Sequence, residues 1–136
     1  MARSDDFSPV EPGAIVWCRF PQAGISDPGP KPRSALVVRT GVIDGQPAVE
    51  VAYGTSQKVD RLFPGEFLIT PEDGEAFRLS GLSHPTKFDL SRRLELPFNK
   101  RWFGVAPGAP FGQTPQMGFL HPALVRRASA AHKATK

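Results

Sequence analysis

The sequence has little of what marks several common classes of protein. Its 136 residues include a single cysteine, Cys18, which excludes an intrachain disulfide and a cysteine-based zinc cluster. No apolar run approaches the ~20 residues that cross a bilayer, and the N-terminus carries no apolar segment typical of a secretory signal. We therefore expect a cytoplasmic protein that does not enter a membrane.

Acidic residues are also in the minority. The chain has 17 Lys and Arg against 13 Asp and Glu, a formal net charge of +4. A basic balance favours a polyanionic partner such as nucleic acid. Part of the excess lies in residues 126–136, which we expect to form a solvated basic tail. We expect residues 1–10 to be flexible and residues 11–125 to form one domain, since a chain of this length can bury a substantial core.

What the sequence has in quantity is proline and glycine, 15 and 13 residues, which separate short β-type runs. The "DGQP" stretch between the second and third runs predicts a hairpin turn. Such spacing of short strands predicts a small antiparallel barrel or a curved sheet. The expected strands cover residues 14–20, 34–40, 47–55, 65–71 and, more weakly, 86–91.

Signals for helices are fewer. Thr70 can cap a helix that has Pro71 at its first position, although Gly74 interrupts the pattern. Residues 121–134 have the composition of a terminal helix. Residues 102–119 combine Gly and Pro with aromatic side chains, and we expect them to form an ordered, irregular lid over the sheet.

Four motifs occur in an order that resembles the MazF/PemK family of toxin endoribonucleases. They are "PGAIVWCRFP", "PGPKPRSALVV", "VAYGTSQK" and "PGEFLI", and the resemblance covers roughly residues 12–97. It implies a mainly β fold, an SH3-like small antiparallel β-barrel with one to three short helices, usually a homodimer. It also implies a type II toxin that cuts single-stranded RNA without a metal or other cofactor, and an acidic antitoxin as partner.

In the reaction that the resemblance implies, the ribose 2′-hydroxyl attacks the adjacent phosphate and leaves a 2′,3′-cyclic phosphate and a 5′-hydroxyl. Arg33 matches the family's arginine at a strand entrance, where a guanidinium can bind two phosphate oxygens. Thr55 matches the family's hydroxyl at the end of the next strand. Two simpler interpretations remain open: Arg33 pairs with a surface carboxylate, and Thr55 closes an ordinary turn on its own backbone.

Other residues are expected to support RNA binding or proton transfer. The candidates beside the two catalytic positions are Ser56, Gln57, Lys58, Lys31, His84 and Lys87. Asp60, Glu66, His84 and Asp89 are the groups that could carry a proton. The three histidines share no metal-ligand spacing, so we expect no metal site.

One departure from the family pattern and two alternative functions accompany this interpretation. Ser34 stands where the family usually has a proline after the arginine, so Arg33 is expected to be less rigidly placed. We expect Trp17 to be half-buried, Cys18 to face the interior, and Trp102 and Phe103 to belong to the core. A non-catalytic SH3-like module that binds nucleic acid or peptide, or a basic protein that acts through its tail, would share these features.

Overall fold

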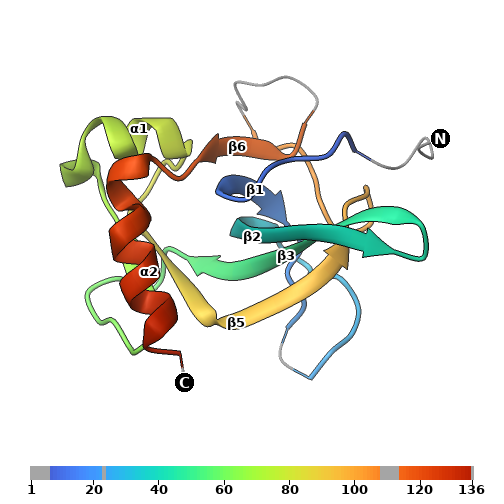
Figure 1. The fold of residues 1–136 in the computed structure, drawn as a ribbon, viewed down its shortest axis with the longest axis horizontal. Helices are drawn as coiled ribbons and strands as arrows, with labels where there is room; N and C mark the ends of the chain where they lie inside the picture. The colour runs from blue at the N-terminus through green and yellow to red at the C-terminus, as the bar shows by residue number, and fades with distance from the viewer. Residues whose placement is uncertain (1–6, 23, 108–113, 136) are drawn as a thin grey trace.

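The centre of the molecule is a six-stranded antiparallel sheet (Figure 1). The computed structural model describes residues 7–22, 24–107 and 114–135. The strands lie in the order β4-β5-β3-β2-β1-β6, so β4 and β6 are the two edges and are not paired with each other. The mainly β class predicted from the sequence is confirmed. The strands are β1 (Ala14–Cys18), β2 (Arg33–Ile43), β3 (Gln46–Thr55), β4 (Glu66–Ile69), β5 (Thr86–Pro97) and β6 (Gln116–Phe119).

Strands β2 and β3 form the long hairpin at the right of Figure 1. Its turn is the pair Asp44 and Gly45, with φ values of 50° and 78°. Positive φ at both central residues is the type I′ arrangement, whose twist matches that of the flanking strands. The predicted hairpin is therefore confirmed at the expected place.

Strand β5 continues to Pro97, well beyond the predicted end at residue 91. Its pairing with β3 changes register: Ala52 lies opposite Arg93, whereas Tyr53 lies opposite Asp89. Residues 90–92 form a bulge between these two pairs. A bulge reverses the alternation of faces, and the strand therefore does not show a continuous period of two in the sequence.

Strand β6 lies inside the segment that we expected to be an irregular lid. Gln116–Phe119 pairs with β1, and a run of four residues with a central Gly118 gives little β signal on its own. Residues 108–113 of the expected lid lie outside the described residues. Trp102 and Phe103 are buried in the core, as predicted.

Two apolar clusters hold the sheet, one on each face. Alternate residues of β1 divide between them: Val16 and Cys18 join one cluster, and Ile15 joins the other with Trp17 packed half-buried against it. Burial raises the pKa of the Cys18 thiol, which keeps it protonated and apolar in character. The first cluster includes Phe98 and Phe103, and the second includes Phe67 and Phe88.

The predicted helix after Thr70 is divided by Gly74. A 3₁₀ turn, Pro71–Asp73, precedes Gly74, and helix α1 (Glu75–Ser80) follows it. Thr70 and Asp73 form a reciprocal capping box at the start of the turn. The helix α1 contacts strand β6, and a Cβ added at Gly118 would collide with the backbone of α1 at Leu79.

Both ends of the described chain are packed. A 3₁₀ turn, Pro122–Leu124, leads into helix α2 (Val125–Lys133), which includes most of the expected tail and contacts β4 and β5 (Figure 1). Ala131 is buried against the sheet. At the other end Val10 belongs to the core, while residues 1–6 lie outside the described residues. Within the described part, no helix has the length and apolar character to span a membrane.

Candidate functional site

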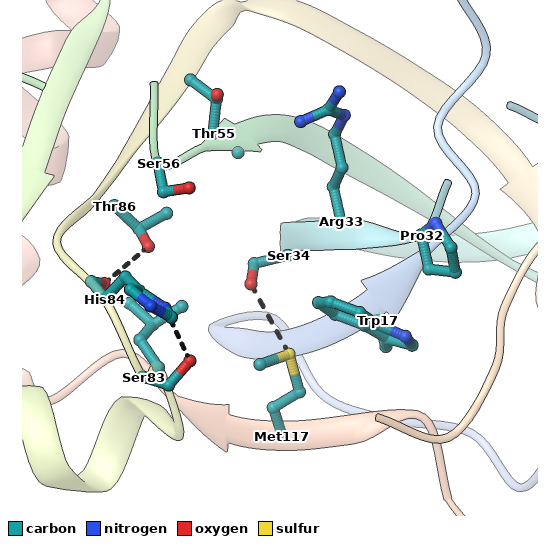
Figure 2. A pocket seen from close by; sticks show the side chains of 12 residues that line it. Trp17, Pro32, Arg33, Ser34, Thr55, Ser56, Ser83, His84, Thr86 and Met117 are labelled. Atoms are coloured by element: carbon teal, nitrogen blue, oxygen red, sulfur yellow. Dashed lines mark hydrogen bonds between the residues drawn. The ribbon is translucent and has the colours of Figure 1, made fainter. Parts of the chain in front are cut away.

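A cavity of about 160 Å³ lies where β2 begins and β3 ends (Figure 2). Figure 2 shows Arg33 on one side of it and His84 on the opposite side, so a ligand in the cavity would lie between them. This volume is below the ~300–1,000 Å³ of pockets that enclose a drug-sized ligand. The cavity therefore suits one group of a larger ligand. Its lining residues are Trp17, Pro32, Arg33, Ser34, Gly54, Thr55, Ser56, Leu82, Ser83, His84, Thr86 and Met117.

The sheet register brings Arg33 and Thr55 to the same edge of the cavity. Ala35 of β2 pairs with Tyr53 of β3, and each predicted residue lies two positions beyond this pair on its own strand. Side chains two apart on a strand share a face. Arg33 and Thr55, far apart in sequence, therefore lie on one face and contribute to one cavity.

Thr55 also closes a turn, as the simpler interpretation required. Its Oγ1 accepts a hydrogen bond of 3.0 Å from the backbone N–H of Gln57. A hydroxyl has one donor and two acceptor positions, so the O–H of Thr55 is still available to donate to a ligand. The turn fixes the hydroxyl oxygen, and it exposes the next residue, Ser56, at the cavity wall (Figure 2).

Gly54 allows the two strands to approach closely behind the cavity. A Cβ at this position would collide with the carbonyl oxygen of Ser34 and lie 2.8 Å from the Phe88 ring. The Ser34 hydroxyl points into the cavity and donates to the Met117 sulfur at 3.6 Å (Figure 2). Because a thioether is a weak acceptor, this hydroxyl can turn toward a better acceptor on a ligand.

His84 is held at the far wall by two neighbours. Its Nδ1 is 2.9 Å from the Ser83 hydroxyl, and its carbonyl oxygen accepts a hydrogen bond of 2.9 Å from Thr86 Oγ1 (Figure 2). Within the described residues, Nε2 has no hydrogen-bond partner. An imidazole held through one nitrogen can accept or donate a proton at the other.

Arg33 supplies the cavity's permanent positive charge. No Asp or Glu is among the described residues that line it, and none of the described carboxylates lies within 4.0 Å of the Arg33 guanidinium. The pairing with a surface carboxylate that we kept open is thus not observed in the described chain. An unneutralised guanidinium in a small cavity with hydroxyl groups on its walls is suited to an anion.

The structure does not bring every predicted residue to the cavity. Arg33, Thr55, Ser56 and His84 line it, whereas Lys31, Gln57 and Lys58 are exposed beside it and do not. Among the other proton carriers, Asp89 accepts hydrogen bonds from Ser91, Asp60 is exposed, and Glu66 is paired with Lys87. Only His84 of that group remains in place for proton transfer.

Lys87 is buried away from the cavity. It pairs with Thr55 of β3, but its side chain is not among those that line the cavity, whereas that of the preceding residue, Thr86, is. Its Nζ lies 3.0 Å from Glu66 Oε1, 2.9 Å from the Arg61 carbonyl oxygen and 5.7 Å from the centre of the Phe63 ring. Glu66 neutralises the charge, and Lys87 therefore holds the chain after β3 rather than binding an external anion.

Several lining residues were not predicted as site residues. Ser34, Ser83 and Thr86 present hydroxyl groups to the cavity or to His84. The sequence analysis noted Ser34 only as a departure from the family pattern. Its position directly after Arg33, at the start of a strand, places it beside the same cavity. Ser83 and Thr86 flank His84 in the sequence, and this clustering of hydroxyls around a histidine was the available signal.

The comparisons with known proteins do not assign a family. No family model matches the chain, and no curated protein matches it. Among the described residues, no group of three or more His, Cys, Asp and Glu side chains is arranged to hold a metal ion. The chemistry of the site therefore has to be argued from the cavity itself.

Proposed function

We propose that the chain is an endoribonuclease of the MazF/PemK type, the toxin of a type II toxin–antitoxin pair, and that the cavity binds the scissile phosphate of single-stranded RNA. One observation carries the proposal: Arg33, Thr55 and His84 line a single small cavity. A fixed cation, a hydroxyl donor and a proton carrier are the groups that phosphodiester cleavage requires.

In the proposed reaction the ribose 2′-oxygen forms a bond to phosphorus and the bond from phosphorus to the 5′-oxygen breaks. The products are a 2′,3′-cyclic phosphate and a free 5′-hydroxyl. Arg33 neutralises the negative charge that grows on the non-bridging oxygens, and the Thr55 hydroxyl donates to one of them. His84 Nε2 carries one of the two protons, either from the 2′-hydroxyl or to the 5′-oxygen, and water exchanges the other.

We also propose that the sheet is an SH3-like barrel of the MazF/PemK type. Support comes from helix α1, which follows β4 along the chain and contacts the opposite edge strand, β6. The chain from β4 through α1 thus connects the two edge strands, which are not paired with each other. The proposal includes the partners of such a toxin: a second copy in a homodimer, and an acidic antitoxin that covers the cavity in the cytoplasm.

The direct test is to incubate the purified protein with a long single-stranded RNA in excess EDTA and to analyse the ends. Discrete cuts with 5′-hydroxyl and cyclic phosphate ends are expected. Retention of the RNA without any cut would contradict the proposed activity and favour a binding module. Hydrolysis that stops in EDTA would contradict the proposed use of the 2′-hydroxyl without a metal.

The matched variants are Arg33→Ala and Arg78→Ala. Arg33→Ala should lower the cleavage rate by about 10²–10³-fold, the usual effect of removing a group that stabilises transition-state charge. It should also relieve growth inhibition. Arg78 is exposed and paired with Glu75 on α1, so Arg78→Ala removes the same charge and should leave the rate unchanged. Cleavage by Arg33→Ala at the wild-type rate would show that the cavity is not the catalytic site.

A further inference from the structure

A second pair of side chains continues from the cavity across the same face of the sheet. Tyr53 lies two residues before Thr55 on β3 and therefore faces the same way. The Arg33 guanidinium carbon is 6.0 Å from the centre of the Tyr53 ring. The Arg92 guanidinium carbon lies only 4.0 Å from the same centre. One phenol ring thus connects the arginine of the cavity with a second arginine.

The bulge in β5 places Arg92 there. Residues 90–92 lie between the paired residues Asp89 and Arg93, where β5 loses its regular register with β3. Bulges re-aim side chains and are frequent beside functional sites. The Phe20 ring contacts both partners, with its centre 5.3 Å from the Arg92 guanidinium carbon and 5.3 Å from the Tyr53 ring centre.

The charge of this cluster is not compensated within the described residues. No described carboxylate lies within 4.0 Å of Arg33 or Arg92, whereas Arg39, Arg78, Arg101 and Arg127 each have one. Stacking on an aromatic ring satisfies the face of a guanidinium but leaves its N–H groups at the edge free to bind an anion. Two like charges around one ring are most stable when an anion lies near both.

We propose that Arg92 and Tyr53 form a second phosphate-binding subsite, which holds the phosphate next to the scissile one in a single RNA strand. The inference rests on the proposed function, since it takes the strand in the cavity as its starting point. Arg92 binds that phosphate by its edge, and Tyr53 sets the orientation of both arginines. Arg92 is a binding residue and does not touch the reacting atoms.

The experiment is equilibrium binding of a labelled, single-stranded 2′-O-methyl RNA, which lacks the attacking hydroxyl, at a series of salt concentrations. Arg92→Ala should weaken binding about tenfold, as expected for a lost hydrogen bond to a charged group. It should also reduce the slope of log affinity against log salt by about 0.7, the value for one phosphate contact on a single strand. Arg92→Lys should retain most of the slope.

Arg101→Ala is the matched control. Arg101 also lies over an aromatic ring, 5.5 Å from the centre of Trp102, but it is paired with Asp27 at 3.2 Å. The control removes the same charge and should change neither affinity nor slope. If Arg92→Ala and Arg101→Ala behave alike, the subsite is overturned. Binding of an acidic peptide through Arg92 when the RNA alone does not bind there would overturn it as well.

The outcomes separate this inference from the proposed function. If the wild type binds RNA through Arg92 but never cuts it, the subsite stands and the nuclease is rejected. If the wild type cuts RNA and Arg92→Ala changes neither the salt slope nor the KM, the nuclease stands and the subsite is rejected. If both hold, Arg92→Ala should raise KM and leave kcat close to its original value, because the contact is made equally in the ground and transition states.

Discussion

Arg33 and Lys87 make an instructive comparison, because the sequence alone assigned both to an RNA-binding site. Arg33 lies at the mouth of β2, part-exposed, with no described carboxylate beside it. The side chain of Lys87 is 6% exposed and is paired with Glu66, itself 11% exposed. One cation is therefore available to a ligand, whereas the other is already neutralised inside the protein.

This difference shows that the composition gives the number of charged residues but not which of them are free to bind a ligand. Thr86 borders the cavity, whereas the next residue, Lys87, is buried and does not line it. Lys87 bonds to the Arg61 carbonyl and lies against Phe63, both in the chain that follows the cavity wall. Its role is to hold that chain in place.

The largest effect on folding should come from Lys87→Met. It leaves the Glu66 carboxylate buried without a partner, which costs about 3–5 kcal/mol when one member of a buried pair is removed. Urea unfolding should show this loss. The double change Lys87→Met with Glu66→Leu should recover most of the stability, because both charges are then absent. Unchanged stability in the single variant would contradict the structural role of Lys87, and with it the difference from Arg33.

Gly54→Ala tests the close packing of β2 and β3 behind the cavity that contains Arg33. The new Cβ would collide with the Ser34 carbonyl and crowd the Phe88 ring, so β2 and β3 must separate behind the cavity. Crowding of this kind costs about 1–3 kcal/mol. Gly45→Ala is not a suitable control, since its φ of 78° disfavours any side chain. Gly104→Ala is better, because a Cβ there would meet Trp17 Cδ1 at an ordinary 3.9 Å.

Much of the fold follows from local patterns. The turn at Asp44 and Gly45, the cap at Thr70 and the terminal helix were all predicted from residue type and spacing. The continuation of β5 and the pairing of β6 were not, because both depend on contacts with distant strands. A bulge, in particular, changes which face a residue occupies without leaving a local signal.

The candidate site likewise contains residues that were predicted from the sequence and residues that only distant contacts place there. Arg33 and Thr55 were predicted because the motifs around them resemble those of the MazF/PemK family, and the register brings the two residues together. Ser34, by contrast, acquires its place from Gly54 and Met117, which lie on other strands. The burial of Lys87 depends on Glu66, another distant partner. Such pairings belong to tertiary structure, and residue type alone does not reveal them.

Thr55→Val sharpens the contrast within the cavity. It removes the O–H that we propose to donate to a phosphate oxygen, and it also removes the acceptor for the Gln57 N–H. Loss of one hydrogen bond to a charged group predicts a fall in kcat/KM of about tenfold or more. Thr55→Ser keeps the hydroxyl and should retain most of the activity. Equal activity in the valine variant would assign Thr55 to the turn alone.

Among the predicted changes, Asp73→Asn should have the smallest effect. Asp73 is ion-paired, as Lys87 is, but it is only half-buried, as Arg33 is. Asp73 receives two hydrogen bonds of 3.1 Å from the Arg127 guanidinium, and this contact holds its pKa below the ordinary value, with a further contribution from the Thr70 N–H. The folded protein therefore binds the proton less tightly than the unfolded chain. The carboxylate stabilises the fold above the ordinary Asp pKa of ~3.9, and this contribution is lost as the pH falls through the lowered value.

Thermal unfolding at a series of pH values measures that contribution. At pH 7, Asp73→Asn should lower Tm by about 1–3 °C, in the range of a partly exposed ion pair. The difference between variant and wild type should shrink as the pH falls through the lowered pKa of Asp73, because its carboxylate then becomes protonated. Arg78→Ala breaks a pair in which both side chains are about two-thirds exposed and should change Tm less at every pH. A difference that stays the same throughout the acid range would mean that Asp73 acts through its capping hydrogen bond and not through its charge.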